Sequence, residues 1–425
     1  MAVTELLALN DVIAKCNRCG FCQAGCPVYR VTGQEHSLSR GRLAIARSLM
    51  LGEIELTPEV AHALEDCLLC RGCTAHCFPA LKTDEVVLAL RHAYLEKHGH
   101  PLWQRVLFRS VLADGKRLEW AGRWAVWAKR TGLAKAAEKA GFGGADSPLS
   151  AANEVVPELP ERFFRRGERH AGADVDKAAS RIGYFVSCGL SFQFPEVVEA
   201  TLRVLGRAGC SVTILDNTCC GRPAHAYGDL DAARDIARRN IDRLAVTEGL
   251  EAVVSDCGSC STHLKDYAHL LADDAAYAAK AAAFSAKVRS FSEFLAAKGL
   301  GPAEGRVEAT VTYHDPCHLS NRFAKVTAQP RALLKSVPGV TFKELPEADW
   351  CCGASGSYTF LHHSEATGVL DRKMDKVSTT GANILATECP ACMMHLGYGV
   401  RRRGLPVQVR HVSQVLDDAA GGAAH

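Results

Sequence analysis

The 425-residue sequence has no excess of charge of either sign, since 50 lysines and arginines stand against 47 aspartates and glutamates. This balance gives no electrostatic reason to expect nucleic acid or an acidic polymer as a partner. Long hydrophobic runs are also missing, and the longest ones fall short of the roughly 18–20 apolar residues that a membrane-spanning helix needs. No "G-x-G-x-x-G" follows an expected strand, and no flavin motif or acyl-transfer triad stands out. The chain therefore gives no sign of a reaction pocket of its own.

Cysteine, by contrast, is abundant, with 19 in the chain. So many thiols indicate either disulfides in an oxidising compartment or metal in a reducing one. The start of the chain, "MAVTELLALNDVIAKC", has acidic residues and no basic region before an apolar stretch, so it does not resemble a secretory signal. We therefore expect a cytoplasmic protein whose cysteines bind metal.

Two cysteine runs lie near the start, "CNRCGFCQAGCP" and "CLLCRGCTAHCFP". Both follow the spacing C-x2-C-x2-C-x3-C, the bacterial ferredoxin pattern for a pair of [4Fe–4S] cubanes in which the fourth cysteine ligates the other cluster. Zinc sites do not call for three cysteines in seven residues. The pattern assigns Cys16, Cys19, Cys22 and Cys77 to one cubane, and Cys67, Cys70, Cys73 and Cys26 to the other. We expect Gly20, Gly25 and Gly72 to let the backbone approach the cluster sulfides.

The sequence around these runs is helical in pattern. Apolar residues recur at helical spacing over residues 43–50, and Thr57 followed by Pro58 is typical of a helix start. Amphipathic patterns over residues 4–16 and 84–97 predict two more helices. The first hundred residues therefore predict a helical module that holds two clusters.

Ten further cysteines form two groups of five. Cys219 and Cys351 each begin a Cys-Cys-Gly doublet, and they are 132 residues apart, as are Cys257 and Cys389. A constellation repeated at fixed spacing indicates an internal duplication. The first pentad is Cys188, Cys219, Cys220, Cys257 and Cys260, and the second is Cys317, Cys351, Cys352, Cys389 and Cys392.

Each pentad lies in a pattern of alternating strands and helices. The expected strands are 181–188, 211–216, 252–257, 309–317, 340–345 and 383–389, and the expected helices are 196–208, 229–247, 261–272, 364–378 and 390–402. This alternation predicts a parallel sheet in each copy, with the cysteines on loops at the carboxyl ends of the strands. Five thiolates exceed the four that zinc or a cubane takes. A doublet followed by glycine would place two sulfurs on a strained turn, each bound to a different iron or one bridging two.

The spacing C-x30–38-CCG-x35–36-C-x2-C resembles the cysteine-rich, or CCG, domain. This domain occurs twice in heterodisulfide reductase catalytic subunits and in the iron–sulfur subunits of glycolate oxidase and related D-lactate and anaerobic glycerol-3-phosphate dehydrogenases. The stretches "CGFCQAGCPVY" and "WCCGASGSYTF" are most similar to the glycolate oxidase iron–sulfur subunit. The resemblance covers essentially the whole chain.

The resemblance implies an α plus α/β fold in which a helical two-cluster ferredoxin module precedes two duplicated Rossmann-like CCG domains. The expected boundaries are 1–100 for the ferredoxin-like module, 101–180 for a tryptophan-rich linker, and 181–305 and 306–425 for the two CCG domains. It also implies one or two further [4Fe–4S] clusters, of non-cubane type, in the pentads. Many glycolate-type relatives lack some of these cysteines, whereas this chain keeps all ten, so zinc or an empty site remains an alternative for the first pentad.

The implied function is electron transfer. A separate FAD-containing subunit would oxidise a 2-hydroxy acid such as glycolate or D-lactate, and this chain would carry the electrons to a quinone or a soluble carrier. The alternative is a catalytic subunit of the heterodisulfide reductase type, which reduces a disulfide at non-cubane clusters. A scaffold protein that is stabilised by structural zinc sites and has no redox role is a third alternative.

Several residues fall outside the ligand pattern. Cys210 enters an expected strand and is interpreted as a buried small residue. His225, His314 and His318 lie beside pentad cysteines and are either partners of cluster sulfur or ordinary strand-end histidines. Residues 101–135 carry four of the five tryptophans, with eight Lys/Arg against two Asp/Glu. A helix with Trp120, Trp124 and Trp127 on one side would either pack against a neighbour or lie on the inner face of a membrane.

Overall fold

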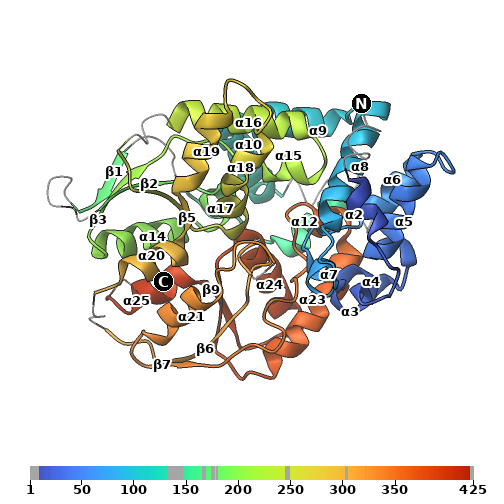
Figure 1. Cartoon of the computed structure of the whole chain (residues 1–425). Coiled ribbons are helices and arrows are strands. Elements are labelled where there is room, and N and C mark those ends of the chain that lie inside the picture. The colour runs from blue at the N-terminus through green and yellow to red at the C-terminus, as the bar shows by residue number, and fades with distance from the viewer. Residues whose placement is uncertain are drawn as a thin grey trace.

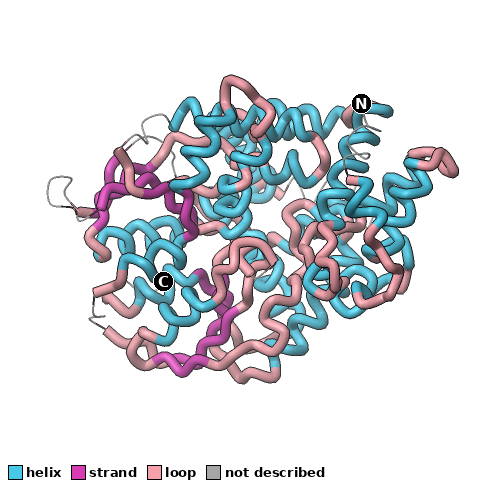
Figure 2. The backbone as a smooth tube through the Cα atoms, viewed as in Figure 1, coloured by secondary structure: helices cyan, strands magenta, loops and turns pink. Residues whose placement is uncertain are grey.

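The structure is a computed structural model that describes residues 9–132, 147–164, 169–173, 178, 180–244, 249–301, 305–320 and 322–421. The N-terminal helix expected over residues 4–16 is described only from residue 9 on, as α2. No helix among the described residues is both long enough and apolar enough to cross a membrane. Figures 1 and 2 show a helical module at one end of the molecule and two sheet-containing regions at the other.

The helical module surrounds the two cysteine runs. Its helices are α2 (Asn10–Ala14), α3 (Cys22–Gly25), α4 (Pro27–Thr32), η1 (Glu35–Ser37), α5 (Ser39–Met50), α6 (Pro58–Glu65), α7 (Gly72–Ala75) and α8 (Thr83–His98). The expected start of α6 is confirmed, because the Thr57 hydroxyl accepts a hydrogen bond from the Val60 backbone N–H. An apolar core that includes Leu43, Leu64 and Leu90 joins α5, α6 and α8.

The segment that follows packs on both CCG copies. It contains α9 (Leu102–Val106), the π-helical turn η2 (Leu107–Val111), α10 (Gly115–Arg130), α12 (Pro148–Val155) and β1 (Arg169–Gly172). Helix α12 packs against α22 (Tyr358–Leu361) and α24 (Pro390–Arg403) of the second copy. Strand β1 pairs antiparallel with β3 at the edge of the first sheet. The charged stretch at 161–170, which the sequence presents as a connection, therefore ends in a strand.

The two CCG copies have the same sheet topology. The first sheet has the order β1-β3-β2-β4-β5 and the second has the order β7-β6-β8-β9. Apart from β1, all neighbouring strands are parallel. The strands are β2 (Ser180–Tyr184), β3 (Cys210–Ile214), β4 (Ala252–Ser255), β5 (Val288–Ser290), β6 (Ala309–Tyr313), β7 (Val340–Phe342), β8 (Ile384–Thr387) and β9 (Gln408–His411). The structure confirms the parallel sheets and the six strands expected from sequence.

Helices cover both sheets. In the first copy they are α13 (Cys188–Gln193), α14 (Pro195–Arg207), α15 (Arg222–Ala226), α16 (Leu230–Arg243), α17 (Gly258–Lys265), α18 (Tyr267–Leu270), α19 (Ala278–Lys287) and α20 (Phe291–Lys298). In the second copy they are α21 (Ala328–Lys335), α22 (Tyr358–Leu361), α23 (His363–Ser378), α24 (Pro390–Arg403) and α25 (Val412–Asp418). All five expected helices are present, although the one expected over 261–272 is divided into α17 and α18.

The two copies face each other across their cysteine loops. The backbone N–H of Gly258 donates to the carbonyl oxygen of Glu388 at 2.7 Å, which joins the two C-x2-C turns. On another part of the interface, Arg203 and Arg207 of α14 pair with the buried Asp417 of α25, at 2.6 and 2.7 Å. Side chains from both copies share two apolar clusters. This packing brings the loops that carry the two pentads together.

Candidate metal centres

The two N-terminal cysteine runs adopt the same unusual loop. The residue before the second cysteine of each run, Arg18 or Leu69, has a positive φ, 54° and 53° respectively. The residue after that cysteine, Gly20 or Arg71, also has a positive φ, 87° and 55°. Three of these four residues carry side chains that rarely adopt this conformation. Each run is therefore wound tightly enough to turn successive thiols toward one point.

Gly25 and Gly72 of these runs allow two short helices to pack closely. A Cβ on Gly25 would lie 2.3 Å from the carbonyl oxygen of Gly72, and a Cβ on Gly72 would lie 2.3 Å from that of Gly25. The short helices α3 and α7 thus cross backbone to backbone, and only glycine permits this approach. The approach of the backbone to cluster sulfides at these glycines stays a prediction.

The crossed grouping of cysteines is visible in the surroundings of their thiols. Burial raises the pKa of Cys26 to about 11, with Cys70 and Cys67 among the neighbours that raise it further. The pKa of Cys73 is raised by burial and then by Cys67, Cys70 and Cys26. Cys16 and Cys77, the first and last cysteines of different runs, pack against one apolar cluster. The structure therefore places Cys26 near thiols of the second run, whereas Cys77 shares an apolar cluster with Cys16 of the first.

Arg42 provides an independent test of whether an anionic cluster fits among these thiols. Its side chain on α5 is 2% exposed, and its Nε and Nη2 atoms have no hydrogen-bond partner among the described residues. Cys67, Cys26, Cys73 and Asp66 are the groups whose negative charge would raise the pKa of Arg42. A buried guanidinium without a partner is costly, and a cluster ligated by four thiolates would supply the missing negative charge. The donor set and Arg42 together fit a [4Fe–4S] cluster.

Every cysteine of the pentads lies beyond the carboxyl end of a strand. Cys188 follows β2, the first doublet follows β3, and Cys257 follows β4. The second copy repeats this order after β6, β7 and β8. Gly221 and Gly353, which follow the doublets, have φ values of 89° and 88°. Since ligands in open α/β sheets bind at this edge, the duplicated sheets place both pentads where a ligand is expected.

Within each pentad the thiols contact one another in the same pattern. Hydrogen bonds from Cys219 and Cys260 lower the pKa of Cys220 well below its usual value. In the second copy, hydrogen bonds from Cys351 and Cys392 lower the pKa of Cys352 in the same way. The Sγ atoms of Cys352 and Cys392 are 3.4 Å apart. The second cysteine of each doublet is therefore the most acidic thiol of its doublet, as suits a metal ligand.

The two pentads share one cavity. Its volume is about 260 Å³, and all ten pentad cysteines line it. Arg222, His318 and Ser259 contribute polar groups to its wall, while Tyr227, Phe360 and Met394 make part of it apolar. The chain folds these thiols around one shared cavity rather than around separate sites. A site for a single metal ion uses about four ligands. Ten thiols around one cavity exceed this number and suit clusters that contain several irons.

Packing also connects the separate groups. Cys70 of the second run lies in one buried cluster with Cys351 and Cys317 of the second pentad. Between the two pentads, the Ser259 hydroxyl of the first copy lies 3.5 Å from the Cys389 sulfur of the second. Ser355, just after the second doublet, donates to the carbonyl oxygen of Leu68 at 3.3 Å. The groups therefore stand in a row, from the N-terminal runs through the second pentad to the first.

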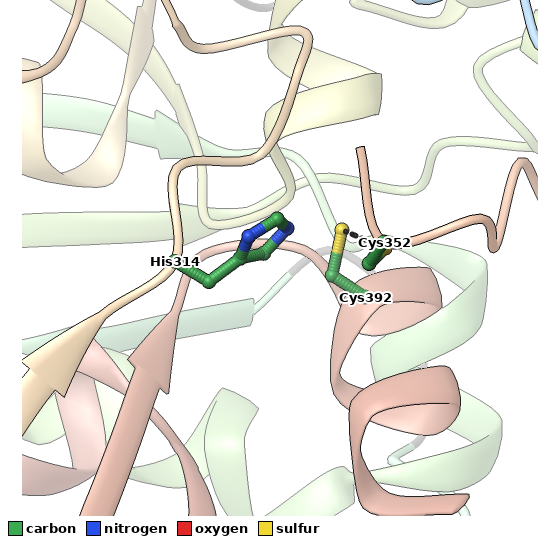
Figure 3. A group of neighbouring side chains, drawn as sticks. All are labelled: His314, Cys352 and Cys392. Carbon is green, nitrogen blue, oxygen red and sulfur yellow. Dashed lines mark hydrogen bonds between the residues drawn. The ribbon is translucent and has the colours of Figure 1, made fainter. Parts of the chain in front are cut away.

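The three histidines singled out from sequence have different surroundings. His314 shares a hydrogen bond of 3.1 Å with the Ala348 carbonyl oxygen through Nδ1, and one of its ring nitrogens lies within 4.8 Å of the thiols of Cys352 and Cys392 (Figure 3). His318 contacts Arg222 at 3.0 Å and Ser259 at 3.0 Å. His225 accepts a hydrogen bond of 3.4 Å from Arg222. His314 thus lies beside Cys352 and Cys392, and His318 lies in the wall of the cavity that the pentads share.

Several buried polar residues near the thiols were not found from sequence. His263 and His395 follow the second cysteine of each C-x2-C pair by three residues, and neither ring nitrogen of either has a hydrogen-bond partner among the described residues. Lys373 is fully buried and donates to the carbonyl oxygens of Glu347 and Ala348, just before the second doublet. The 132-residue offset pairs His263 with His395 and would have found them. Arg42 and Lys373 have no counterpart in the 132-residue repeat that would have pointed to them.

Cys210 is separate from all these groups. It lies in β3, its side chain is fully buried, and burial raises its pKa. Its sulfur contacts only the carbonyl oxygen of Ala208, at 4.0 Å, among the hydrogen-bond partners described. This confirms its interpretation as a buried small residue and leaves eighteen cysteines in the candidate centres.

Comparison with known proteins agrees with this arrangement. A family model described as a 4Fe-4S dicluster domain matches residues 12–79, and one described as a cysteine-rich domain matches twice, at residues 182–265 and 311–397. A "Lactate utilization protein A" from an Exiguobacterium strain is 30% identical over 239 residues, which cover 56% of this chain and 97% of that protein.

Two relatives extend over nearly the whole chain. The "Glycolate oxidase iron-sulfur subunit" of Escherichia coli K12 is 26% identical over 97% of this chain and 95% of its own length. The "Probable glycolate oxidase iron-sulfur subunit" of Bacillus subtilis 168 is 31% identical over 96% of this chain and 94% of its own length. With both domain types present in the same order, the chain belongs to the family of glycolate oxidase iron–sulfur subunits.

Proposed function

We propose that this chain is the iron–sulfur electron-transfer subunit of a flavin-dependent 2-hydroxyacid dehydrogenase, with glycolate or D-lactate as the substrate of the flavin subunit. The observation that carries the proposal is the row of cysteine groups, in which Cys70 packs in one cluster with Cys351 and both pentads line one cavity. Such a row suits a protein that conducts charge. The names of the relatives give the substrate class.

The proposed cofactors are two cubane [4Fe–4S] clusters in the N-terminal runs and one non-cubane [4Fe–4S] cluster in each pentad. The eighteen cysteines outside Cys210 are the proposed ligands, in the sets expected from sequence. When bound, these clusters supply one-electron chemistry, which allows the two electrons of a flavin to be taken up singly. The intact pentad in the first copy and the cavity shared by all ten cysteines support a cluster in both copies.

The surrounding residues hold the sites in shape and supply compensating charge. Lys373 ties down the loop before the second doublet through the carbonyl oxygens of Glu347 and Ala348. The first copy has Ile241 at the position that corresponds to Lys373. Arg42 places a buried positive charge beside the second cysteine run. Local charge and burial set the potentials of iron–sulfur sites. Because Lys373 of the second copy is replaced by Ile241 in the first, the two pentads have different electrostatic surroundings.

The end of the row at the first cubane site is the proposed docking place for the flavin subunit. Cys19 is exposed, and so are two aromatic rings next to cysteines assigned to this cubane, Phe21 at 64% and Phe78 at 96%. Phe21 lies between two cysteines assigned to this cubane, and Phe78 follows the fourth, Cys77. Exposed apolar side chains of this size are typical of protein interfaces. The acceptor at the other end of the row is a quinone or a soluble carrier.

The test is reconstitution of the anaerobically purified chain with the flavin subunit of its own complex. Glycolate or D-lactate should then bleach the visible absorbance of the iron–sulfur chain, and the chain alone should show no bleaching with either acid. The double variant Phe21→Ser/Phe78→Ser should retain its iron and acid-labile sulfide but lose most of this reduction. Absence of bleaching in the wild-type complex, with all clusters present, would refute the proposed role.

The heterodisulfide reductase alternative is not favoured by the relatives that match the full chain. It makes a distinct prediction, because the purified chain alone, supplied with a reduced dye, would then reduce a heterodisulfide. The electron-transfer proposal expects no turnover in that assay. Near-stoichiometric zinc without acid-labile sulfide would instead favour the scaffold alternative.

A further inference from the structure

The helix α10 presents three tryptophans to solvent. Trp120, Trp124 and Trp127 are 63%, 50% and 50% exposed. Their rings follow one another along the helix, with centroids 5.8 Å apart for the first pair and 4.9 Å for the second. Among the described residues no other element presents such a row of large exposed rings. Exposed apolar surface of this size indicates a binding face.

The opposite side of α10 fixes the orientation of this row. Leu118 is buried, and a Cβ on Gly122 would lie 2.7 Å from the ring of Phe192. The Lys129 ammonium group hydrogen-bonds to the carbonyl oxygen of Val156. The Asp114 side chain caps the first turn by accepting from the backbone N–H groups of Lys116 and Arg117. The helix is therefore anchored on the first CCG copy, and its tryptophans face outward.

Exposed cations flank the tryptophan row. Lys116, Arg117, Arg123 and Arg130 are exposed, and Glu119 is the single acidic residue of the helix. Arg123 lies 3.9 Å from Glu119, and Arg130 lies 2.9 Å from the exposed Glu161, so both pairs are open to water and weak. The face formed by the three tryptophans and these four cations, the Trp–cation face, is thus complementary to a surface with negative charge.

We propose that the Trp–cation face binds the surface of a bilayer that contains anionic lipid. Tryptophan rings combine an apolar body with a polar N–H and suit the interface between headgroups and acyl chains. Long basic side chains on both sides reach the lipid phosphates while their stems cover the apolar boundary. No described helix can span a membrane, so the attachment is peripheral.

The position of the Trp–cation face relates membrane binding to electron transfer, an argument that rests on the proposed function. The carbonyl oxygen of Leu112, three residues before α10, accepts a hydrogen bond from the backbone N–H of Cys219. The Trp–cation face is therefore connected to the first doublet, at the end of the row of cysteine groups. Binding to a bilayer would hold that end close to a lipid-soluble acceptor.

The experiment is binding of the full-length, cluster-loaded chain to lipid vesicles. We expect co-sedimentation with vesicles rich in phosphatidylglycerol, weaker binding to pure phosphatidylcholine vesicles, and loss of binding at high salt. Tryptophan fluorescence should shift to shorter wavelength on binding. The triple variant Trp120→Ser/Trp124→Ser/Trp127→Ser should bind at least about tenfold more weakly, because each ring contributes buried apolar area. Leu361→Ser, which removes a different exposed apolar side chain, should bind as the wild type does.

Charge is tested separately from the aromatic rings. The variant Arg117→Gln/Arg123→Gln/Arg130→Gln should bind phosphatidylglycerol vesicles only as weakly as phosphatidylcholine vesicles, because the tryptophans remain and the electrostatic attraction is lost. Wild-type binding that is absent, or that is unchanged in the tryptophan variant, would overturn the proposal. So would binding of the flavin subunit that requires the three tryptophans while vesicles are not bound. Iron and sulfide analysis of the same samples shows independently whether the proposed function has failed.

Discussion

At the scale of single residues, the most informative side chain is Arg42. Its charge is buried, and its Nε and Nη2 atoms find no partner among the described residues, although the thiols of the second cysteine run surround it. Salt bridges elsewhere on the surface contribute little to stability, whereas a buried cation beside an anionic cluster shifts the potential of that cluster. The same reasoning applies to Lys373, which is present in only one of the two copies.

Arg42→Met should lower the midpoint potential of one cubane. A unit charge at roughly 8 Å is worth about 2 kcal/mol at an effective dielectric constant of about 20. Since about 59 mV corresponds to about 1.4 kcal/mol for one electron, the expected fall is on the order of 90 mV. A redox titration followed by electron paramagnetic resonance measures it. Arg47→Met, at an exposed position of the same helix, is the control and should leave the potential unchanged.

The outcome separates an electrostatic role from a structural one. If the Arg42 variant keeps its iron and its potential, the guanidinium does not act on a cluster. If the Arg42 variant loses iron, the potential of the remaining clusters cannot distinguish an electrostatic role from a structural one. The variant Arg42→Lys then provides the second measurement. Lysine retains the charge, so iron content and potential should then return toward those of the wild type.

At the scale of elements, the crossing of α3 and α7 is the most constrained contact of the helical module. Gly25→Ala would place a methyl group 2.3 Å from a backbone oxygen, which neither short helix can avoid without moving its cysteines. We expect this variant to lose most of the iron of the helical module while the pentads keep theirs. Gly397→Ala, in α24, is the control, because the nearest atom to its Cβ is the end of the Arg401 side chain, at 3.5 Å. Retention of full iron content by Gly25→Ala would contradict this account.

Sequence patterns predicted the elements that have strong local signals. Thr57 and Pro58 marked the start of α6, and β-branched runs that end in cysteine marked β2, β4, β6 and β8. Strand β1 was not predicted, because it lies in a charged stretch and owes its existence to pairing with β3. Strand β5, of three residues, is too short for a periodic signal, and its parallel neighbour β4 determines its place.

At the scale of the whole molecule, the main result is that both pentads line one cavity. The duplication predicted two sites, but spacing alone contains no information on whether they meet. The meeting depends on contacts between distant residues, such as Gly258 with Glu388 and Arg203 with Asp417. The same limit applied to Arg42, whose role follows from the fold of the helical module and from no pattern in the sequence.

Removal of the metal should lower the stability of the whole molecule against unfolding. Without clusters the ten pentad thiols surround an unfilled space, and the buried Nε and Nη2 atoms of Arg42 have no hydrogen-bond partner among the described residues. Because ligands that bind only the folded state stabilise it, chelation under anaerobic conditions should lower the unfolding temperature. Circular dichroism of the chelated and reconstituted chain measures this. An unchanged unfolding temperature after complete loss of iron would show that the cysteine groups are not structural metal sites.

The most direct measurement is an anomalous difference map at the iron absorption edge, from crystals of the chain purified and grown without oxygen. The account predicts four iron clusters in a row: two in the helical module, and one at each end of the cavity that the pentads share. Each doublet should lie against iron. Disulfides within the doublets, a single zinc peak in either pentad, or a first pentad without iron would contradict it.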